Sequence, residues 1–398
     1  MFAHIDADAF FASVLQRKHP RLKGKPLLAL GMGGGCVIAA SYEAKRRGVK
    51  TGMPLKEARA LCPEALHIPC DFGETALASE QIEGILTSHS PMVEQYSIDE
   101  WFLDLAALPG GEPFDLLLWA KELREEILKA TDISVSIGIA YSKTLAKMAS
   151  DAKKPAGIVV VEKRDIEHFL CDLPAAAIPG IGHARQGHAT ARKWITAWDI
   201  ATADKEIVQK LFGKPGLELQ RELLGERVYP IVVDAAPPKS LSRCRSFRTT
   251  GDKGLLWAHV LEHLGITVQR LRTHVFSCRG ISVWLRDGQY RYDGLRLRLP
   301  QPCTTEEAIA PFARKLLFQL LRRHRTATQV GLCLFDFCPM GSMQFSLFRN
   351  PKETMREEEL QKSLDSLQKR FGRNVVMKGS MMPVYKRRDR LLNLSILE

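Results

Sequence analysis

Short apolar runs alternate with stretches of helical spacing along the first part of the chain. Continuous apolar runs at residues 2–6, 133–140 and 157–161 are typical of buried strands. Apolar residues recur every three or four positions at 74–89 and 114–130, which indicates helices. The pattern therefore predicts a sheet backed by helices.

A small α/β unit is predicted after the first strand, over about residues 12–70. Apolar runs at 26–30 and 36–40 flank the glycine-rich stretch 31–35 and indicate a hairpin. A phosphate-cradling loop is the alternative, but no Gly-Lys-Ser/Thr follows and the next run is strand-like. Helical spacing at 9–18 precedes the hairpin; further helices are expected at 42–48 and 54–61.

The sequence pattern changes twice after residue 163. Residues 164–229 predict short helices with Gly and Pro between them, and 230–239, with Pro237-Pro238, predicts a linker. Residues 239–338 then predict the order strand, helix, two strands around Asp287-Gly288, helix, strand. This βαββαβ order suggests a small sheet with two helices on one face.

A last amphipathic helix is predicted over residues 352–371, with Gly372 as its C-terminal signal. Its apolar positions share one stripe: Met355, Leu360, Leu364, Leu367 and Phe371.

Positive charge is concentrated in one segment. The chain has 57 Lys and Arg against 45 Asp and Glu, a net charge of +12. Residues 239–338 contain 17 Lys and Arg against 7 Asp and Glu, which is +10. A solvated basic face is one interpretation, but this concentration favours a polyanionic partner such as nucleic acid.

Cysteine usage and hydropathy favour an intracellular protein. The nine cysteines are scattered, with no C-x-x-C pair, so neither a disulfide framework nor a zinc site is indicated. No apolar run reaches membrane-spanning length, and no signal peptide precedes the first strand. We expect a cytoplasmic protein without membrane association. The cysteines stand at positions 36, 62, 70, 171, 244, 278, 303, 333 and 338.

Two acidic spots lie beside apolar, strand-forming residues. Asp6 follows the first strand-like run, and the adjacent pair Asp99 and Glu100 stands in a second one. Carboxylates from separated strands that converge on one point form a hard-cation site of the Mg²⁺ type. Adjacent strand residues point to opposite faces, so Asp99 and Glu100 share a site only at a strand end or turn. A turn with solvated acids is the alternative.

Five segments together resemble the Y family of translesion DNA polymerases. They are residues 4–14, 40–54, 97–100, 136–157 and 178–182, in the order that this family shows. The resemblance covers about 1–340 and implies an α+β, multidomain, right-hand polymerase fold. Its expected parts are a palm (1–11 and 71–162), small fingers (12–70), a helical thumb with a helix-hairpin-helix (163–230), a linker (231–241), a βαββαβ little finger (242–338) and a tail (339–398).

The resemblance implies a site with two Mg²⁺ ions. Asp6 and Asp99 would bridge the metals, Glu100 would join the metal near the primer 3′-OH, and the Ala7 carbonyl would be a further ligand. Asp6, Asp99 and Glu100 would thus be the catalytic residues. Asp8 is expected to be structural.

The resemblance also assigns nucleotide contacts. Phe11 matches the steric gate, an aromatic ring that leaves no room for a ribose 2′-OH. Tyr42, Lys45 and Lys154 match the triphosphate binders. The family often has Arg where Lys45 stands, and Lys lacks the bidentate fork of Arg.

DNA and clamp contacts complete the expectations. Gly180 and Gly182 would let backbone N–H groups meet a DNA phosphate. The arginines of the little finger's first strand are expected to bind DNA: Arg243, Arg245 and Arg248. Residues 344–348 are similar to the clamp-binding pentapeptide of bacterial polymerases, with Gln344, Leu347 and Phe348 as anchors.

The sequence therefore predicts a monomeric, low-fidelity, template-directed DNA polymerase that uses dNTPs on primer–template DNA and binds a bacterial sliding clamp. One alternative is a catalytically inactive member of the same family, acting as a DNA-binding adaptor in a mutasome. The other is a nucleotide cyclase-like enzyme. The acidic trio opposes the first alternative, and the basic segment with the glycine hairpin opposes the second.

Overall fold

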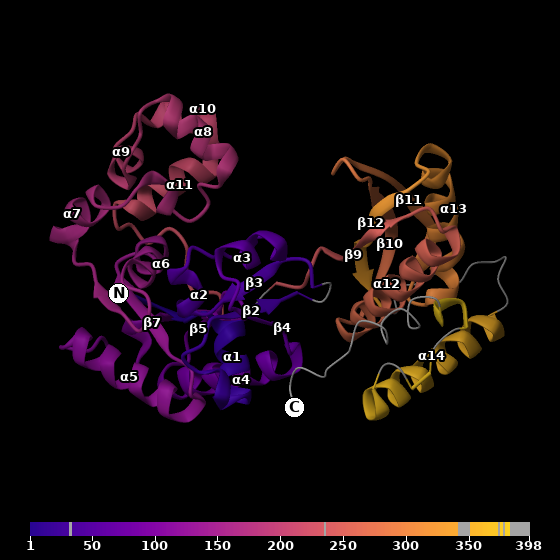
Figure 1. The fold of residues 1–398 in the computed structure, drawn as a ribbon, viewed down its shortest axis with the longest axis horizontal. Coiled ribbons are helices and arrows are strands. Elements are labelled where there is room, and N and C mark those ends of the chain that lie inside the picture. Colours follow the sequence, from indigo (N-terminus) through magenta and orange to yellow (C-terminus); the bar gives the residue numbers. More distant parts are fainter. Residues whose placement is uncertain (32–33, 235, 341–350, 373–374, 377–378, 383–398) are drawn as a thin grey trace. The chain divides into compact units, whose positions relative to one another are not determined.

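The computed structural model divides the chain into two compact units, Met1–Ala235 and Ala236–Glu398 (Figure 1). Their boundary falls inside the predicted linker 231–241. The structure describes all residues except 32–33, 235, 341–350, 373–374, 377–378 and 383–398.

A five-stranded sheet forms the centre of the first unit, in the order β5-β6-β1-β7-β8. The central strand β1 pairs antiparallel with both β6 and β7, while β7 and β8 are parallel. The strands are β1 (Phe2–Ala7), β5 (Val93–Gln95), β6 (Glu100–Asp104), β7 (Val135–Ala140) and β8 (Ile158–Val160).

Helices cover both faces of this sheet, and strand alternation sorts the side chains between them. Ala3, Ile5 and Ala7 join the core with the helices α4 (Phe72–His89) and α5 (Leu116–Thr131). The intervening residues of β1 point to the opposite face, which α6 (Lys143–Ala152) covers. Asp6 belongs to this second set, so α6 approaches the acidic side of the sheet.

Gly138 on β7 allows α6 to approach the sheet closely. A Cβ at this position would lie 2.1 Å from the carbonyl oxygen of Ala146 and 2.3 Å from the amide nitrogen of Ser150. On β1, the Nδ1 of His4 lies 2.7 Å from the Ser150 hydroxyl. The missing side chain of one glycine thus sets the position of the helix over Asp6.

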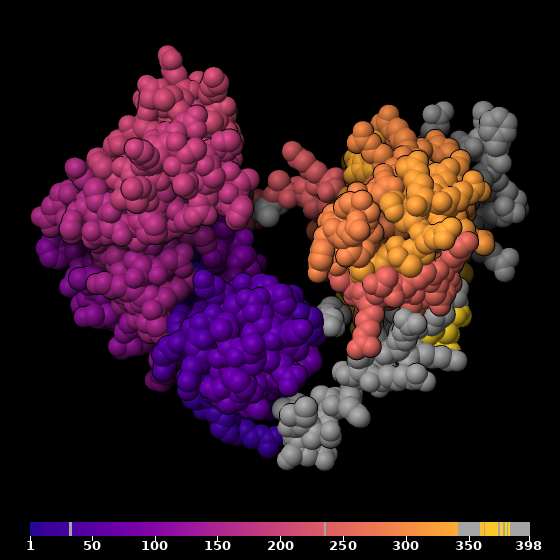
Figure 2. Space-filling model, turned by 45° about the horizontal axis from the view of Figure 1, so that its top comes forward, coloured from indigo at the N-terminus to yellow at the C-terminus, as the bar shows by residue number. Residues whose placement is uncertain are grey.

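A three-stranded sheet with the order β3-β2-β4 follows β1 in the sequence. The predicted hairpin is confirmed, because β2 pairs antiparallel with β3; β2 and β4 are parallel. Figure 2 shows this segment in indigo. Its elements are α1 (Phe10–Lys18), β2 (Leu27–Leu30), β3 (Val37–Ala40), α2 (Tyr42–Arg46), α3 (Leu55–Leu61) and β4 (Leu66–Pro69).

Short helices form the rest of the first unit, as predicted. Buried Glu222 joins them to α6, because its carboxylate accepts hydrogen bonds from the backbone N–H groups of Thr144 at 2.9 Å and Val228 at 2.8 Å. The helices are α7 (Ile166–Cys171), α8 (His183–Ala191), α9 (Ala197–Ala201), α10 (Lys205–Phe212) and α11 (Lys214–Leu223).

The second unit confirms the predicted βαββαβ order. Its four strands form one antiparallel sheet in the order β11-β10-β12-β9. Helices α12 and α13 pack on the sheet around a shared apolar core. The elements are β9 (Ser240–Thr250), α12 (Lys253–Thr273), β10 (Phe276–Arg286), β11 (Tyr292–Cys303), α13 (Glu306–Arg323) and β12 (Ala327–Pro339).

The predicted last helix is present as α14 (Pro351–Phe371). A bidentate ion pair joins it to α12, with two distances of 2.7 Å between the Arg272 guanidinium and the Asp365 carboxylate. Part of its apolar stripe remains exposed, at Leu360, Leu367 and Phe371. Within the described residues, no helix is long and apolar enough to span a membrane.

Candidate active site and nucleic-acid interface

The three predicted catalytic acids occupy neighbouring backbone positions at one end of β1 and β6. Asp6 and Glu100 are directly opposed in the β1–β6 pairing, so both side chains belong to the α6 face. Asp99 lies in the turn just before β6, and its carbonyl accepts a hydrogen bond from the Ala7 N–H at 2.9 Å. The position at a strand end, which two adjacent acids require, is therefore present.

Lysines from α6 and its C-terminal extension pair with acids on three neighbouring strands. Lys147 forms an ion pair with Glu100 on β6. Lys154 pairs with Asp6 on β1 at 2.6 Å and with Asp151 at 2.7 Å.

A third pair continues this row at the edge of the sheet. Lys143, one helical turn before Lys147, pairs with Glu94 on β5 at 2.6 Å. Lys143, Lys147 and Glu94 are partners that the sequence did not lead us to expect. The spacing of four between the two lysines was the available signal, because it places them on one helix face.

The oxygen atoms of this site suit a hard divalent cation, although the carboxylates of Asp6 and Glu100 pair with lysine ammonium groups in this structure. Among the residues that the structure describes, no three His, Cys, Asp or Glu side chains lie close enough to hold a metal ion. Carboxylates and a backbone carbonyl are nevertheless the oxygen ligands that Mg²⁺ prefers. Asp6 is 6% exposed and already requires a cation partner. The ammonium groups of Lys147 and Lys154 must move aside for a metal to bind.

Burial controls the protonation of this site. It raises the pKa of Asp6 to about 7, and the charge of Lys154 only partly opposes the shift. Burial also acts to lower the pKa of Lys154, but the carboxylates of Asp6 and Asp151 outweigh it, so that pKa is raised. Asp6 therefore gives up its proton most readily when another cation approaches.

Asp8 is structural, as predicted. Its buried carboxylate accepts hydrogen bonds from the hydroxyls of Tyr42 at 3.2 Å, Ser134 at 3.0 Å and Ser136 at 2.8 Å. The Ala156 N–H donates a fourth hydrogen bond at 2.8 Å. These contacts join β7, the turn after α6 and the start of α2 beside Asp6.

The predicted triphosphate binders are neighbours in the structure. The Lys45 ammonium lies 4.4 Å from the centroid of the Tyr42 ring. The pKa of Lys45 is lowered by burial and then by the charge of Lys154. Two close ammonium groups repel each other unless an anion lies between them. This arrangement suits a polyphosphate.

Phe11 lies at the start of α1. Its ring centroid is 5.9 Å from that of Phe72 at the start of α4, in an edge-on arrangement. Phe10 is buried in the core, whereas Phe11 is only partly buried. Phe11 therefore keeps a ring surface that a sugar can contact.

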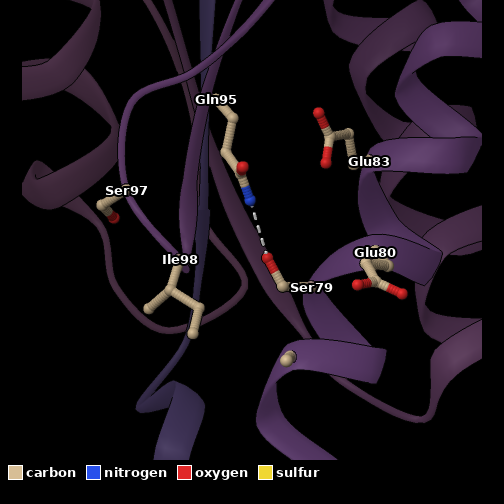
Figure 3. Close-up of a pocket in the computed structure, with 7 residues that line it drawn as sticks. Ser79, Glu80, Glu83, Gln95, Ser97 and Ile98 are labelled. Atoms are coloured by element: carbon tan, nitrogen blue, oxygen red, sulfur yellow. Dashed lines mark hydrogen bonds between the residues drawn. The ribbon is translucent and has the colours of Figure 1, made fainter. Parts of the chain in front are cut away.

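An open pocket of about 440 Å³ lies beside the acidic turn, but its chemistry differs from a nucleotide site (Figure 3). The side chain of Gln95 donates a hydrogen bond to the Ser79 hydroxyl at 3.0 Å across it. Because Glu80 and Glu83 lie on its helical wall, the pocket repels phosphate groups. The remaining lining residues are Ala76, Ser97 and Ile98.

The predicted glycine hairpin leads directly into α8. Gly180 has a φ of +89°, which favours glycine, and Gly182 is the N-cap residue of α8. The first N–H groups of a helix have no acceptor within the helix and can meet a phosphate.

Arg243 and Arg245 differ from the expectation of DNA contact, because they lie on the side of β9 that faces α12. Their register partners on β12, Leu332 and Val330, are buried in the core. Arg245 lies 3.8 Å from the carboxylate of Glu262 on α12. These two arginines therefore belong to the interface between sheet and helix. Arg248, in contrast, is exposed.

The opposite face of the second sheet carries aromatic rings and further arginines. The Trp284 ring lies across Gly331, where a Cβ would be 2.1 Å from a ring atom. Arg296 and Arg298 on β11 are exposed on this face, opposite Ser282 and Gly280 of β10. Basic groups on a sheet face that none of the described helices covers are suited to DNA phosphates.

The predicted clamp anchors Gln344, Leu347 and Phe348 lie outside the described residues.

Comparisons with known proteins match most of the chain. Models of the impB/mucB/samB family match residues 5–151, and those of its C-terminal domain match residues 238–347. DNA polymerase IV 1 of Halalkalibacterium halodurans is 33% identical, over 97% of this chain and 94% of the relative. DNA polymerase IV of Moorella thermoacetica is 31% identical, over 93% of each chain.

Solved structures of Y-family polymerases have a similar fold. A Y-family DNA polymerase chimera of Dbh and Dpo4 has a TM-score of 0.73 at 27% identity, covering 85% of this chain and 99% of the other. DinB from Sulfolobus solfataricus has a TM-score of 0.57 at 26% identity, with the same coverage. The chain therefore belongs to the impB/mucB/samB family and is a DNA polymerase of the Y family.

Proposed function

We propose that the chain performs template-directed, low-fidelity DNA synthesis from dNTPs across damaged templates. The observation that carries the proposal is the pairing of Asp6 with Glu100 beside the Asp99 turn, on the sheet face where Lys147 and Lys154 converge. Neither alternative has a specific observation in its favour. The expected parts, palm, fingers, thumb and little finger, keep their predicted boundaries in this proposal.

Asp6, Asp99, Glu100 and the Ala7 carbonyl would hold two Mg²⁺ ions. Such ions lower the pKa of the attacking 3′-hydroxyl and neutralise charge on the leaving pyrophosphate. The protein supplies fixed carboxylates at a strand end and a close helix behind them. Until the substrate arrives, Lys147 and Lys154 offset the negative charge of Glu100 and Asp6.

The incoming nucleotide would lie between the start of α1 and the start of α2. Lys45 and Lys154 would bind its phosphates, and Tyr42, fixed by its hydrogen bond to Asp8, would contact the triphosphate edge-on. Phe11 would close the space under the sugar and exclude ribonucleotides.

The chain would bind DNA through its phosphates, without recognising the base sequence. The first turn of α8 after Gly180 and Gly182 would meet one backbone phosphate. Arg248, Arg296 and Arg298 would meet others from the open face of the second sheet. We do not extend this role to Arg243 and Arg245, because they face α12.

Asp99→Asn tests the catalytic assignment. We expect no detectable primer extension with Mg²⁺ and dNTPs, with primer–template affinity almost unchanged, because the DNA contacts lie elsewhere. Asp104→Asn is the matched control. Asp104 is the last residue of β6 and accepts a hydrogen bond from the Ala106 N–H, so its substitution should leave extension intact. Extension at the wild-type rate by the Asp99 variant would contradict the assignment.

The chain would act as a cytoplasmic monomer recruited by a bacterial sliding clamp. Gln344 would hydrogen-bond at the rim of a clamp pocket, and Leu347 and Phe348 would fill it. Replacing both apolar anchors with Ala should leave clamp-free extension unchanged and abolish stimulation by a loaded clamp. Undiminished stimulation would assign clamp binding to another segment.

A further inference from the structure

Two tyrosines at the β10–β11 hairpin are exposed although they are large and aromatic. Tyr290 is 76% exposed and Tyr292 is 62% exposed. Tyr292 opposes Arg286 in the strand pairing, so it belongs to the same sheet face as Trp284, the face away from α12 and α13. Exposed rings of this kind on a basic surface are typical of binding sites rather than of packing.

The turn that carries Tyr290 is pre-organised. The Asp287 carboxylate accepts hydrogen bonds from the N–H groups of Gln289 at 2.8 Å and Arg291 at 3.0 Å. The side chain of Arg291 returns to Asp287 at 2.9 Å. Tyr290 has a φ of 62°, within this closed loop. Its ring is therefore presented by a fixed backbone, and its ordering costs little on binding.

Arg286 stands beside both rings. Its guanidinium carbon is 5.0 Å from the ring centroid of Tyr290 and 6.0 Å from that of Tyr292. The guanidinium is anchored by hydrogen bonds to the hydroxyls of Thr328 at 3.3 Å and Ser246 at 3.4 Å. A fixed positive charge thus accompanies the two aromatic surfaces.

The acidic residues near the hairpin do not neutralise the positive charge of Arg286. Asp287 pairs with Arg291 at 2.9 Å, and Asp293 lies 2.8 Å from His324 and 3.5 Å from Arg323. Residues 286–298 contain four Arg and two Asp, a net charge of +2; Arg298 is also paired with Asp336 at 2.8 Å, whereas Arg286 pairs with neither of the hairpin's two described acids. The surface therefore offers π-faces and positive charge together.

We propose that Tyr290 and Tyr292 form a stacking platform for unpaired bases of the template strand, with Arg286 beside the backbone phosphate. Bases within a duplex already stack on each other, so only an unpaired base presents a free face to a tyrosine. A template strand has unpaired bases ahead of the primer terminus in every extension reaction. The platform thus rests on the proposed polymerase function and adds a binding site for single-stranded template.

Binding of full-length protein to primer–templates with a blunt end or a single-stranded 5′ overhang of increasing length tests the platform. We expect the Tyr290→Ala/Tyr292→Ala variant to bind the overhang DNA more weakly by about 5- to 150-fold for each ring that stacks on a base. Its affinity for blunt duplex should be unchanged. A 2-aminopurine in the overhang should be quenched by the wild type and not by this variant.

Controls separate stacking from other effects. Tyr290→Phe/Tyr292→Phe keeps the rings and should bind as wild type, which also shows that the hydroxyls are not required. Phe114→Ala removes a fully exposed aromatic ring from the first unit and should change neither affinity. Equal weakening on blunt and overhang DNA, or none at all, would overturn the platform. Single-nucleotide extension at saturating DNA reports separately on the polymerase function, which could fail while overhang binding persists.

Discussion

Asp6, which we propose as a metal ligand, shows how burial affects the protonation of a single carboxylate. Its carboxylate is almost inaccessible, and Lys154 is its ion-pair partner at 2.6 Å. Metal binding requires the ionised carboxylate, so a proton and a cation compete for it. Because burial raises its pKa to about 7, this competition falls within the physiological pH range.

We predict that the Mg²⁺ requirement of primer extension depends on pH. Below the raised pKa of Asp6, about 7, each lower pH unit reduces the ionised fraction about tenfold. The Mg²⁺ concentration for half-maximal extension should rise about fivefold from pH 7 to pH 6 and change little from pH 8 to pH 9. Measuring primer extension over a range of Mg²⁺ concentrations at each pH gives this half-maximal concentration. A requirement that stays constant from pH 8 to pH 6 would show that Asp6 is not protonated in this range.

At the scale of elements, the distance of α6 from the sheet determines whether Lys147 reaches Glu100 and Lys154 reaches Asp6. Gly138 lies under α6, and a side chain there would meet backbone atoms of Ala146 and Ser150. Backbone atoms of a helix cannot rotate away as a side-chain tip can. Any added atom must therefore move α6 away from β7.

Gly138→Ala should accordingly destabilise the first unit and impair catalysis. We expect the free energy of unfolding to fall by about 1–3 kcal/mol, as for other overpacked cores. Extension should fall more than DNA affinity, because Lys147 and Lys154 move with α6. Denaturant unfolding and single-turnover extension measure the two effects.

Gly84→Ala provides the matched control. Gly84 lies within α4, and a Cβ there would meet nothing within 4 Å. The substitution should leave extension unchanged and stabilise the helix by up to about 1 kcal/mol. If Gly138→Ala behaves like this control, the close packing of α6 does not position the lysines.

At the scale of the whole molecule, the excess positive charge is divided between the two faces of the second sheet. Arg243 and Arg245 face α12, whereas Arg248 and Arg296 are exposed. Only arginines that reach DNA phosphates release counterions on binding. Net charge alone therefore overstates the electrostatic contribution of this unit to DNA binding.

The Arg248→Ala/Arg296→Ala variant should bind primer–template with a weaker salt dependence. The slope of log K against log salt should shrink by about 0.9 for each DNA phosphate that the variant no longer neutralises. Lys315→Ala/Arg322→Ala removes the same charge from the exposed side of α13 and should leave the slope nearly unchanged. Equal slopes for both variants would assign DNA binding to general charge rather than to the open sheet face.

The sequence by itself determined the order of the elements and the position of the acids that we propose to be catalytic. The βαββαβ unit could be predicted because apolar residues recur at different spacings in strands and helices, and turn residues such as Asp287-Gly288 separate the elements. Asp6, Asp99 and Glu100 were predicted as a possible cation site because acids beside buried strands need a partner, and the family resemblance then assigned them a catalytic role. In both cases the signal is local, within a few residues of the position concerned.

Only the tertiary structure decided which side chains meet. Strand β9 has polar residues on both of its faces, so its pattern could not say that Arg243 and Arg245 face a helix. The pairing of Lys147 with Glu100 joins residues 47 positions apart and depends on the approach of α6 over Gly138. Contacts of this kind arise from the packing of distant elements, and no local period encodes them.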